Sequence, residues 1–432
     1  MFTYLKQIWN SKDLRNRILF TVGILVLYRF IAHITVPGAD IAGLKAAAAR
    51  NQLLEVFSML TGGSTENFSI VLMGISPYIN ASVIVQLLTV VIPKLENLSK
   101  EGESGRRKIN TYTRWLTLPL AFLQSYGMIV LLNSQAQTPI ISNINDPTLI
   151  LPMMLTISAG TILLVWLGEV ITEKGIGNGI SLLIFASIIS NVPQMVGQGL
   201  FIAQGDESLL IAFIAVILLT IVLITIVILV NEAQRRIPVT YAGRGIKGKS
   251  DQAFIPIRIN QAGMIPIIFA VALVSFPGIL GQFLVNAKSE WVRHLGDNMT
   301  NLFQPNTWAY IGVYFLLVIA FTYFYVSITF NPEQVAESIQ KRGGYVPGIR
   351  PGKQTSEYLG NISSRLTLFG ALFLGFIAVL PILVQFVFRT SGIGSVPLLI
   401  SGAGIIIIVG VVLELIRQIN SMLAMHDYKK FY

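Results

Sequence analysis

The sequence predicts an all-α polytopic membrane protein, and its composition, its apolar runs and its charge pattern lead to this fold class. Of 432 residues, 53% are hydrophobic and only 12% are charged, and this charged share is about half that of an ordinary soluble domain. One water-soluble core cannot bury so much apolar surface. The chain also has no cysteine and three scattered histidines, which excludes disulfides and argues against a metal centre. We expect neither a metal nor a cofactor.

Ten segments are apolar over roughly the 20 residues that a helix needs to cross a bilayer. The clearest is Leu209–Val230, whose only polar residues are two threonines, and we expect Val216 within it to face lipid. Helices are favoured over barrel strands because a helix satisfies its backbone hydrogen bonds within the segment. The predicted spans cover residues 18–36, 76–93, 115–133, 149–168, 179–197, 209–230, 262–285, 307–330, 366–388 and 396–417.

The placement of lysine and arginine predicts the orientation, because cytosolic loops of membrane proteins are enriched in both. With the N-terminus inside, most of the 31 Lys and Arg residues fall on the cytosolic side, and both termini are expected there. Two cytosolic loops, 231–261 and 331–365, are long and rich in Gly and Pro, which predicts a docking surface for a cytosolic partner. Arg29 lies inside the first predicted span, where we interpret it as a snorkelling or paired structural charge.

The loop 231–261 contains GRGIKGKS, residues 243–250, which matches the phosphate-loop pattern GxxxxGK[ST]. A phosphate loop needs a buried strand before it and a helix after it, so that backbone N–H groups converge on phosphate. Here both flanks are short, alternating and proline-bearing, as in the two arms of a β-hairpin. We therefore reject nucleotide binding and predict a hairpin whose basic tip carries Arg244, Lys247 and Lys249. Such a tip suits an acidic protein surface or RNA phosphates.

The segment 67–93, NFSIVLMGISPYINASVIVQLLTVVIP, is apolar but has a helix breaker and small polar residues at its centre. Pro77 has no N–H and Gly74 is flexible, so we expect a helix to begin near Ser76. Residues 57–73 before it are half apolar and too short to cross a bilayer. Irregular backbone persists in a membrane only where protein buries it or it lines a cavity. These residues are predicted to form a re-entrant segment, with a short interfacial helix as the alternative.

The second half of the chain repeats this pattern. GMIPIIFA at 263–270 shares Gly, Pro, Ile and Ala with GISPYINA at 74–81 at the same spacing. Each stretch opens the second span of a five-span half, and an odd number of spans per half inverts the second half. Inverted repeats with broken helices mark a central pathway. We predict an N-terminal half, 1–204, and a C-terminal half, 205–432, around such a pathway.

Five motifs are spread in order along nearly the whole chain: GISPYINASVIVQLLTVVIP, KEGESGRRKINTYTRW, ITEKGIGNGISLLIFASII, IPIRINQAGMIPIIFA and GGYVPGIRPGKQTSEYL. With them the sequence resembles the SecY/Sec61-alpha family, which includes the channel subunit of the bacterial Sec protein translocase. The resemblance implies ten transmembrane helices in two inverted five-helix halves around an hourglass pore. A ring of aliphatic side chains and a re-entrant plug would close it, and a lateral gate would lie between spans two and three and spans seven and eight.

Motif matching then implies roles for individual residues. The pore ring would comprise Ile79, Val83, Ile184, Ile188, Ile268 and Ile407. The plug would include Met59, Leu60, Gly62, Gly63, Phe68 and Val71. The lateral gate would include Ser82, Gln86 and Asn260. The docking surface for a motor or a ribosome would include Arg106, Arg107, Arg244, Lys247, Lys249 and Arg350.

The function implied by the resemblance is a passive protein-conducting channel, not an enzyme. It would pass unfolded secretory polypeptides across the bacterial plasma membrane and release signal sequences and membrane segments into lipid. The implied partners are SecE and SecG subunits, the SecA motor ATPase, the ribosome, signal-sequence-bearing polypeptides and membrane lipids.

An ion-coupled secondary transporter of a small solute is the alternative function, because such a protein can also have ten spans, inverted repeats and broken helices. Transporters of this kind usually bind their coupling ion through an acidic side chain inside the membrane. The predicted span interiors hold Arg29 and, near a cytosolic end, Glu414, with no acidic residue near mid-membrane. The charge pattern therefore favours the channel.

Overall fold

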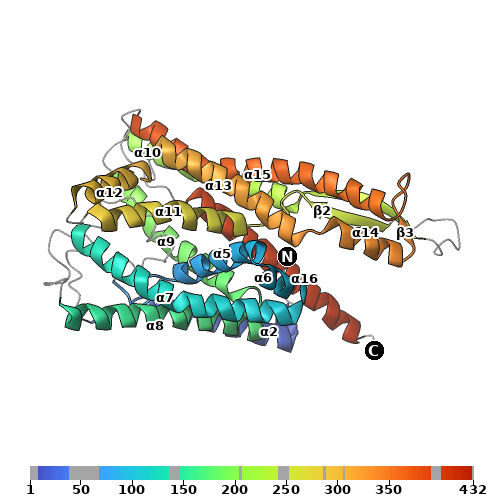
Figure 1. The fold of residues 1–432 in the computed structure, drawn as a ribbon, viewed down its shortest axis with the longest axis horizontal. Coiled ribbons are helices and arrows are strands. Elements are labelled where there is room, and N and C mark those ends of the chain that lie inside the picture. The colour runs from blue at the N-terminus through green and yellow to red at the C-terminus, as the bar shows by residue number, and fades with distance from the viewer. Residues whose placement is uncertain are drawn as a thin grey trace.

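The computed structural model describes residues 8–37, 68–135, 146–203, 207–241, 253–285, 289–304, 307–390 and 400–430. Within them the chain is a bundle of long helices with one small sheet (Figure 1). The helices that coincide with the predicted spans are α2 Lys12–Ile31, α5 Ser76–Val91, α7 Glu103–Gln135, α8 Pro147–Lys174, α9 Gly179–Ala203, α10 Glu207–Glu232, α11 Ile265–Val285, α13 Trp308–Thr329, α15 Lys353–Thr390 and α16 Gly402–Lys430. The shorter helices are α6 Pro93–Lys100, α12 Glu290–Leu302 and α14 Pro332–Lys341.

Six helices in the described part of the chain are long and apolar enough to cross a membrane, or seven if α5 and α6 count as one broken span. The chain is thus a predominantly helical, multi-pass membrane protein, and the figure of ten crossings stays a prediction. α5 and α6 meet at an angle of 106°. The bend falls where Pro93 begins α6, because proline cannot donate a hydrogen bond to the preceding turn.

The first predicted span, 18–36, was placed too far toward the C-terminus. α2 ends at Ile31 because the residues after it pair with the segment before α5 instead of continuing the helix. The N–H of Val36 donates to the carbonyl oxygen of Phe68 at 2.9 Å. Arg29 therefore lies in the last turn of α2, where the helix dipole favours a positive charge.

The predicted helix break before α5 is confirmed. Gly74 has a φ angle of 53°, and Pro77 stands in the first turn of the helix that begins at Ser76. α11 begins in the same way, with Gly263 at a φ angle of 66° and Pro266 as its second residue. A positive φ suits glycine, and proline suits the first turn because an N–H there has no helical partner. The two aligned stretches of sequence therefore share one local geometry.

The loop 231–261 forms the predicted hairpin, and the hairpin's tip lies outside the described residues. β1 Gln234–Tyr241 and β2 Ala253–Arg258 pair antiparallel, and β3 Gly344–Tyr345 pairs with β1 on its other edge. The sheet packs on α14 and on the first turns of α15 through a small core of its own. We call these elements the sheet body, and its buried residues are Ile237, Val239, Ile257, Ala336, Ile339, Val346 and Leu359.

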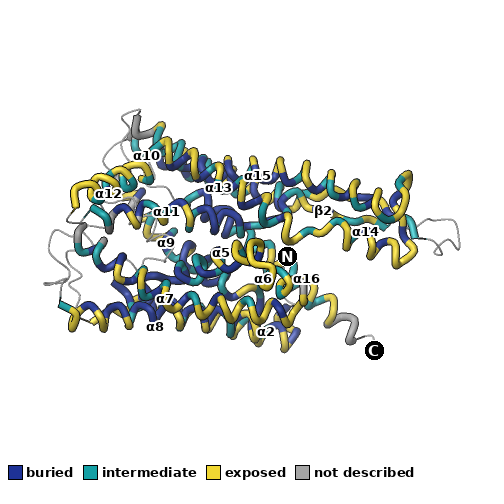
Figure 2. The backbone as a smooth tube through the Cα atoms, in the orientation of Figure 1, coloured by how far each residue is buried: buried dark blue, intermediate teal, exposed yellow. Residues whose placement is uncertain are grey.

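Figure 1 places the sheet body beyond the helical bundle, toward the same end as the C-terminus. The interior of the bundle is one large hydrophobic cluster, which we call the central cluster, with side chains from most of the long helices. Figure 2 shows buried residues running through the middle of the bundle and exposed residues along its outward faces. This is the distribution of a membrane protein whose interior is protein and whose periphery meets lipid.

The expectation that Val216 faces lipid is wrong. Its side chain is only 2% exposed and lies with Ala212 and Phe213 against Met195 and Val196 of α9. α10 is apolar on every side, so its sequence carries no signal for the face that meets protein. Leu218 on the same helix is 59% exposed and is the better lipid-facing position.

Gly160 of α8 allows the segment before α5 to lie directly on that helix. A Cβ atom at this position would be 2.0 Å from the carbonyl oxygen of Ile70. We expect Gly160→Ala to displace the segment and to lower the free energy of unfolding by about 1–3 kcal/mol, as overpacking does. The melting temperature of the purified protein measures this effect. Gly23→Ala is the matched control, because no heavy atom lies within 4 Å of the added Cβ; equal losses in both variants would contradict the prediction.

Candidate functional site

The six predicted pore-ring residues all lie in or against the central cluster. They come from four helices, α5, α9, α11 and α16, so that each predicted half supplies two of them. The buried members, each at most 7% exposed, are Val83, Ile184, Ile188 and Ile407. The partly buried members are Ile79 and Ile268. The structure therefore brings together residues that are more than 300 positions apart in the sequence.

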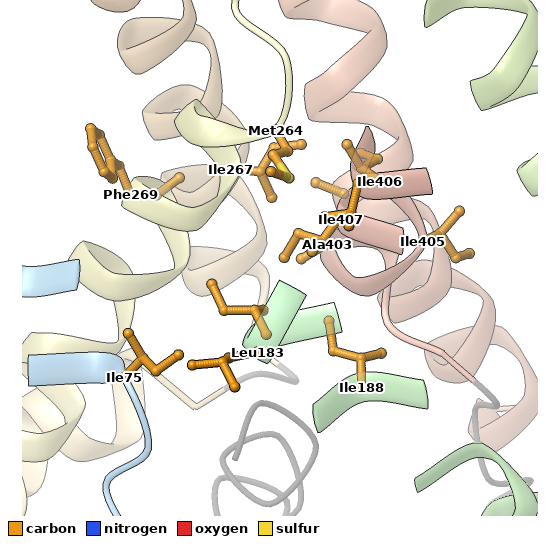
Figure 3. Close-up of a cluster of buried hydrophobic side chains, with 14 of the residues drawn as sticks. Ile75, Leu183, Ile188, Met264, Ile267, Phe269, Ala403, Ile405, Ile406 and Ile407 are labelled. Carbon is orange, nitrogen blue, oxygen red and sulfur yellow. The ribbon is translucent and has the colours of Figure 1, made fainter. Parts of the chain in front are cut away.

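The central cluster reaches well beyond these six residues. Figure 3 shows Ile75, directly before α5, gathered with Leu183 and Ile188 of α9, Ile267 of α11 and Ile407 of α16. Sequence reasoning missed these neighbours because an isoleucine in an apolar span has the same signal whether it faces lipid or protein. Such a cluster offers only dispersion and water exclusion. It excludes water, and its aliphatic side chains offer no polar group for the specific recognition of a ligand.

Two of the predicted plug residues, Phe68 and Val71, fall within the described chain, and both are fully buried. Val71 belongs to the central cluster, whereas Phe68 belongs to a second cluster with side chains of α7 and α8. The hydroxyl of Ser69 donates to the carbonyl oxygen of Ile31 at 3.2 Å and holds the segment to the end of α2. The other four predicted plug residues lie outside the described residues: Met59, Leu60, Gly62 and Gly63.

The predicted gate residues lie on two elements. Ser82 and Gln86 are one turn apart on α5, and Nε2 of Gln86 donates to Oγ of Ser82 at 3.4 Å. α5 lies beside α11, so the two helices of the predicted seam are neighbours. Asn260 lies in the connection between β2 and α11, where its side chain bonds to Asn231 and Gly263. A gate role for these three polar residues stays a prediction.

Three of the predicted docking residues are described, and all three are exposed. Arg106 and Arg107 lie near the start of α7, and Arg350 lies in the turn before α15. The hydroxyl of Thr355 donates to the carbonyl oxygen of Arg350 at 2.9 Å, which fixes this turn to α15. The three tip residues of the hairpin lie outside the described chain: Arg244, Lys247 and Lys249.

A further basic group that the sequence analysis missed lies where the sheet body joins the bundle. Arg417 of α16 pairs with Glu232 at the end of α10, and Arg258 ends β2 nearby. Burial lowers the pKa of Arg258, the positive charge of Arg417 lowers it further, and Glu232 opposes both effects. Only Arg417 is paired with the carboxylate of Glu232, so these three side chains together carry one net positive charge at the base of the sheet body.

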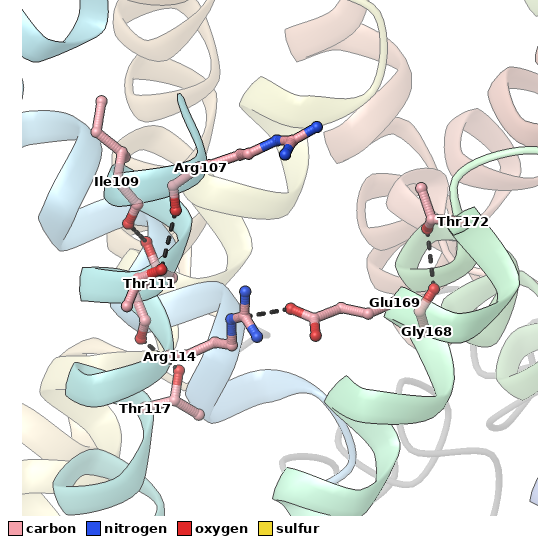
Figure 4. Close-up of polar contacts among 9 residues, drawn as sticks. Arg107, Ile109, Thr111, Arg114, Thr117, Gly168, Glu169 and Thr172 are labelled. Atoms are coloured by element: carbon pink, nitrogen blue, oxygen red, sulfur yellow. Dashed lines mark hydrogen bonds and ion pairs between the residues drawn. The ribbon is translucent and has the colours of Figure 1, made fainter. Parts of the chain in front are cut away.

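Two polar contacts inside the bundle were also missed. Figure 4 shows Arg114 of α7 and Glu169 of α8 reaching toward each other, with Nε and Oε1 3.1 Å apart. Tyr28 of α2 and Ser187 of α9 share a buried hydrogen bond of 2.5 Å. Arg114 directly precedes one predicted span and Glu169 directly follows another, so the ion pair fell just outside both. α7 begins before Arg114 and α8 continues past Glu169, so both charged residues lie within the helices although they lie outside the predicted spans.

The described residues contain no group of three or more His, Asp or Glu side chains that could hold a metal ion. Their functional features are instead an apolar centre, a buried irregular segment before α5 and basic exposed ends. This arrangement suits conduction and docking.

The comparisons with known proteins agree with this reading. The SecY family model matches residues 69–416. The protein translocase subunit SecY of Streptomyces scabiei is 41% identical, and the match covers all of both chains. The subunit of the same name from Mycobacterium bovis is 40% identical over 97% of both chains.

Two solved structures have the same fold. One, reported for the SecY plug domain that stabilises the closed channel, gives a TM-score of 0.66 at 23% identity over 94% of this chain and 91% of that chain. The other, Sec61 in the canine ribosome-channel complex, gives a TM-score of 0.61 at 20% identity over the same shares. At these identities both structures speak for the fold alone.

The fold and the family match define a membrane protein of the translocon class. The chain belongs to the SecY family, whose members are protein-translocation channels. This membership decides for the channel and against the small-solute transporter.

The pair Arg114–Glu169 ties α7 to α8. We expect Glu169→Gln to lower the free energy of unfolding by about 1 kcal/mol, the upper range for a partly exposed pair. The double swap Arg114→Glu with Glu169→Arg should recover most of the loss, as read from melting temperatures. Glu337→Gln in the more exposed pair Glu337–Lys341 is the control and should change little. A double swap no more stable than the single variant would refute the pairing.

Proposed function

We propose that unfolded polypeptides cross the membrane through the central cluster, between α5, α9, α11 and α16. The observation that carries this proposal is the meeting of all six motif-derived ring residues in one apolar cluster built from both halves of the chain. Apolar side chains close tightly around each other and around a passing chain, because dispersion contacts have no fixed direction. The six ring residues form the narrowest part of the pathway, and the channel itself is passive.

The irregular segment before α5 serves as the plug. Val71 extends from this segment into the central cluster, which supports a direct contact between plug and ring. Residues 57–73 then cover the ring from the outer side in the closed channel. Opening requires this segment to leave its place, and its few hydrogen bonds to the end of α2 hold it there until a substrate arrives.

The seam between α5 and α7 on one side and α11 and α13 on the other is the lateral gate. Contact between α5 and α11 supports this position. Ser82, Gln86 and Asn260 contribute polar groups, which makes the seam easier to part than a purely apolar interface. Signal sequences and membrane segments of a substrate leave through it into lipid. The similar starts of α5 and α11, at Gly74 and Gly263, support two inverted halves, 1–204 and 205–432.

The driving force comes from partners that dock on the basic cytosolic face. The solved Sec61 complex named above contains a ribosome, and by family analogy we assign a ribosome and the SecA motor ATPase to this chain. SecE and SecG are its partner subunits. The exposed arginines Arg106, Arg107 and Arg350 support docking on this face, to which we also assign Arg244, Lys247 and Lys249. We place the chain in the bacterial plasma membrane with both termini in the cytosol.

Cysteine crosslinking tests the pathway, because the chain has no cysteine of its own. We expect Ile79→Cys to form a disulfide with a cysteine in a stalled secretory polypeptide, since the ring contacts the passing chain. Leu218→Cys, on the lipid-facing side of α10, should form none. The readout is the disulfide-linked product on a non-reducing gel.

Two crosslinking outcomes would contradict the proposed pathway. If a folded Ile79→Cys channel that still binds its motor or ribosome forms no crosslink, the ring is misplaced. Crosslinks of equal strength at both positions would also refute the pathway, because they would report non-specific contact.

Reversing the charge of Arg350 tests the docking face. We expect Arg350→Glu to weaken binding of SecA or of ribosomes by about tenfold, equivalent to about 1.4 kcal/mol. The measurement is the dissociation constant of the reconstituted complex at fixed ionic strength. Arg293→Glu on the exposed face of α12 changes the net charge equally and should leave binding unaltered. Equal weakening in both variants would show a general charge effect instead of a docking contact.

A further inference from the structure

The connection between β2 and α11, residues 259–264, is held by an unusual buried contact between two asparagines. Nδ2 of Asn260 donates to Oδ1 of Asn231 at 2.7 Å and to the carbonyl oxygen of Gly263 at 3.2 Å. The N–H of Gly263 donates to Oδ1 of Asn260 at 3.0 Å. One side chain thus closes the turn before α11 and joins that turn to the end of α10.

The same connection is fixed at two more points. The N–H of Ile259 donates to the carbonyl oxygen of Ala233, directly after α10, at 3.0 Å. The hydroxyl of Ser363 on α15 donates to Oε1 of Gln261 at 3.0 Å. The connection is therefore attached to α10 on one side and to α15 on the other.

Burial makes these contacts costly to lose. Asn260 is 6% exposed and Asn231 is 9% exposed. A buried amide group without a hydrogen-bond partner destabilises the folded protein by the full free energy of its desolvation. Nε2 of Gln261 is also buried and has no hydrogen-bond partner in the described part of the chain. The side chain of Gln261 is thus tied to α15 through its oxygen alone.

The connection lies between two rigid parts. On one side is the sheet body, whose own core unites β1, β2, α14 and the start of α15. On the other side is α11, which the proposed function places at the lateral gate. The sheet body is also joined to α13 through the two residues that separate α13 from α14. Residues 259–264 are therefore the direct covalent route from the sheet body to α11, beside the indirect route through α13, which packs on α11.

We propose that Asn231 and Asn260 are positioning residues that couple the sheet body to the gate helix α11. Movement of the sheet body on docking of a cytosolic partner is passed to the start of α11 through their hydrogen bond. This inference rests on the proposed function, since it assumes that α11 borders the gate. It assigns to Asn260 a role in the connection that precedes α11.

We call residues 259–264 together with Asn231 the joint. The test compares substitutions in the joint with a control substitution outside it. Asn231→Leu removes the side-chain link to α10 but leaves the backbone bond from Ile259 to Ala233 and both hydrogen bonds between Asn260 and Gly263, so the turn itself is kept. Asn231→Asp keeps an acceptor for Nδ2 of Asn260 and should restore coupling. Thr220→Val is the matched control, because it removes a hydrogen bond within α10 that does not touch the joint.

Spin labels report the gate. Cysteines replacing Leu88 on α5 and Leu273 on α11, both at exposed positions, give the distance across the seam by pulsed electron paramagnetic resonance. Leu273 and Leu316 on α13 give a reference distance within the C-terminal half. Each variant is measured as the assembled complex in nanodiscs, with and without SecA and a non-hydrolysable ATP analogue.

In the unaltered joint we expect SecA to shift the seam distance and to leave the reference distance unchanged. Asn231→Leu should bind SecA with unchanged affinity but lower the SecA-induced ratio of open to closed populations about fivefold, the scale of one buried hydrogen bond. Asn231→Asp and Thr220→Val should respond like the unaltered joint. Should Asn231→Leu fail to fold, Ser363→Ala cuts the other attachment and should reduce the ratio in the same direction.

Three results would overturn the inference. A full response in folded Asn231→Leu or Ser363→Ala would show that the joint does not transmit movement, and would leave the proposed channel intact. A loss of response in Thr220→Val equal to that in Asn231→Leu would show a general effect of weakening α10. No response even in the unaltered joint would refute the proposed gate, and the coupling with it.

Discussion

A backbone that leaves the helix inside this bundle must satisfy its own polar groups, because lipid and apolar side chains offer no hydrogen bonds. The chain meets this demand twice, in two different ways. Before α5, backbone pairing such as that of Val36 with Phe68 satisfies the interrupted segment. Before α11, the side chain of Asn260 closes the turn at Gly263 and reaches Asn231. These two solutions fix where the neighbouring helices α5 and α11 begin, and the packing of both helices in the central cluster depends on them.

The helical bundle is held by two kinds of contact, an apolar cluster at its centre and a few polar contacts between its helices. The central cluster is held by many dispersion contacts that have no fixed direction, each weak but strong together. The polar ties, Tyr28 with Ser187 and Arg114 with Glu169, join α2 to α9 and α7 to α8. Hydrogen bonds and ion pairs, in contrast, demand a defined geometry, so these two contacts specify how the helices lie against each other.

The sheet body extends this logic beyond the membrane-spanning part. A separate hydrophobic core makes it a unit that can receive a partner, and short connections join it to α10, α11, α13 and α15. The positive charge at its base, from Arg258 and Arg417 around Glu232, lies at the same junction. The sheet body and the proposed gate helix α11 are thus adjacent parts of the C-terminal half, whereas α5 and α7 of the proposed gate belong to the N-terminal half.

The sequence by itself determined the helical class, the positions of the long helices, the break at Gly74 and Pro77 and the hairpin of loop 231–261, because each rests on local chemistry. The tertiary structure alone decided the end of α2 at Ile31, the buried face of α10 at Val216 and the pairing of Arg114 with Glu169. It also decided that the motif-derived ring residues meet. These features depend on contacts between distant segments, and an apolar or charged residue carries the same local signal whichever distant neighbour it will contact.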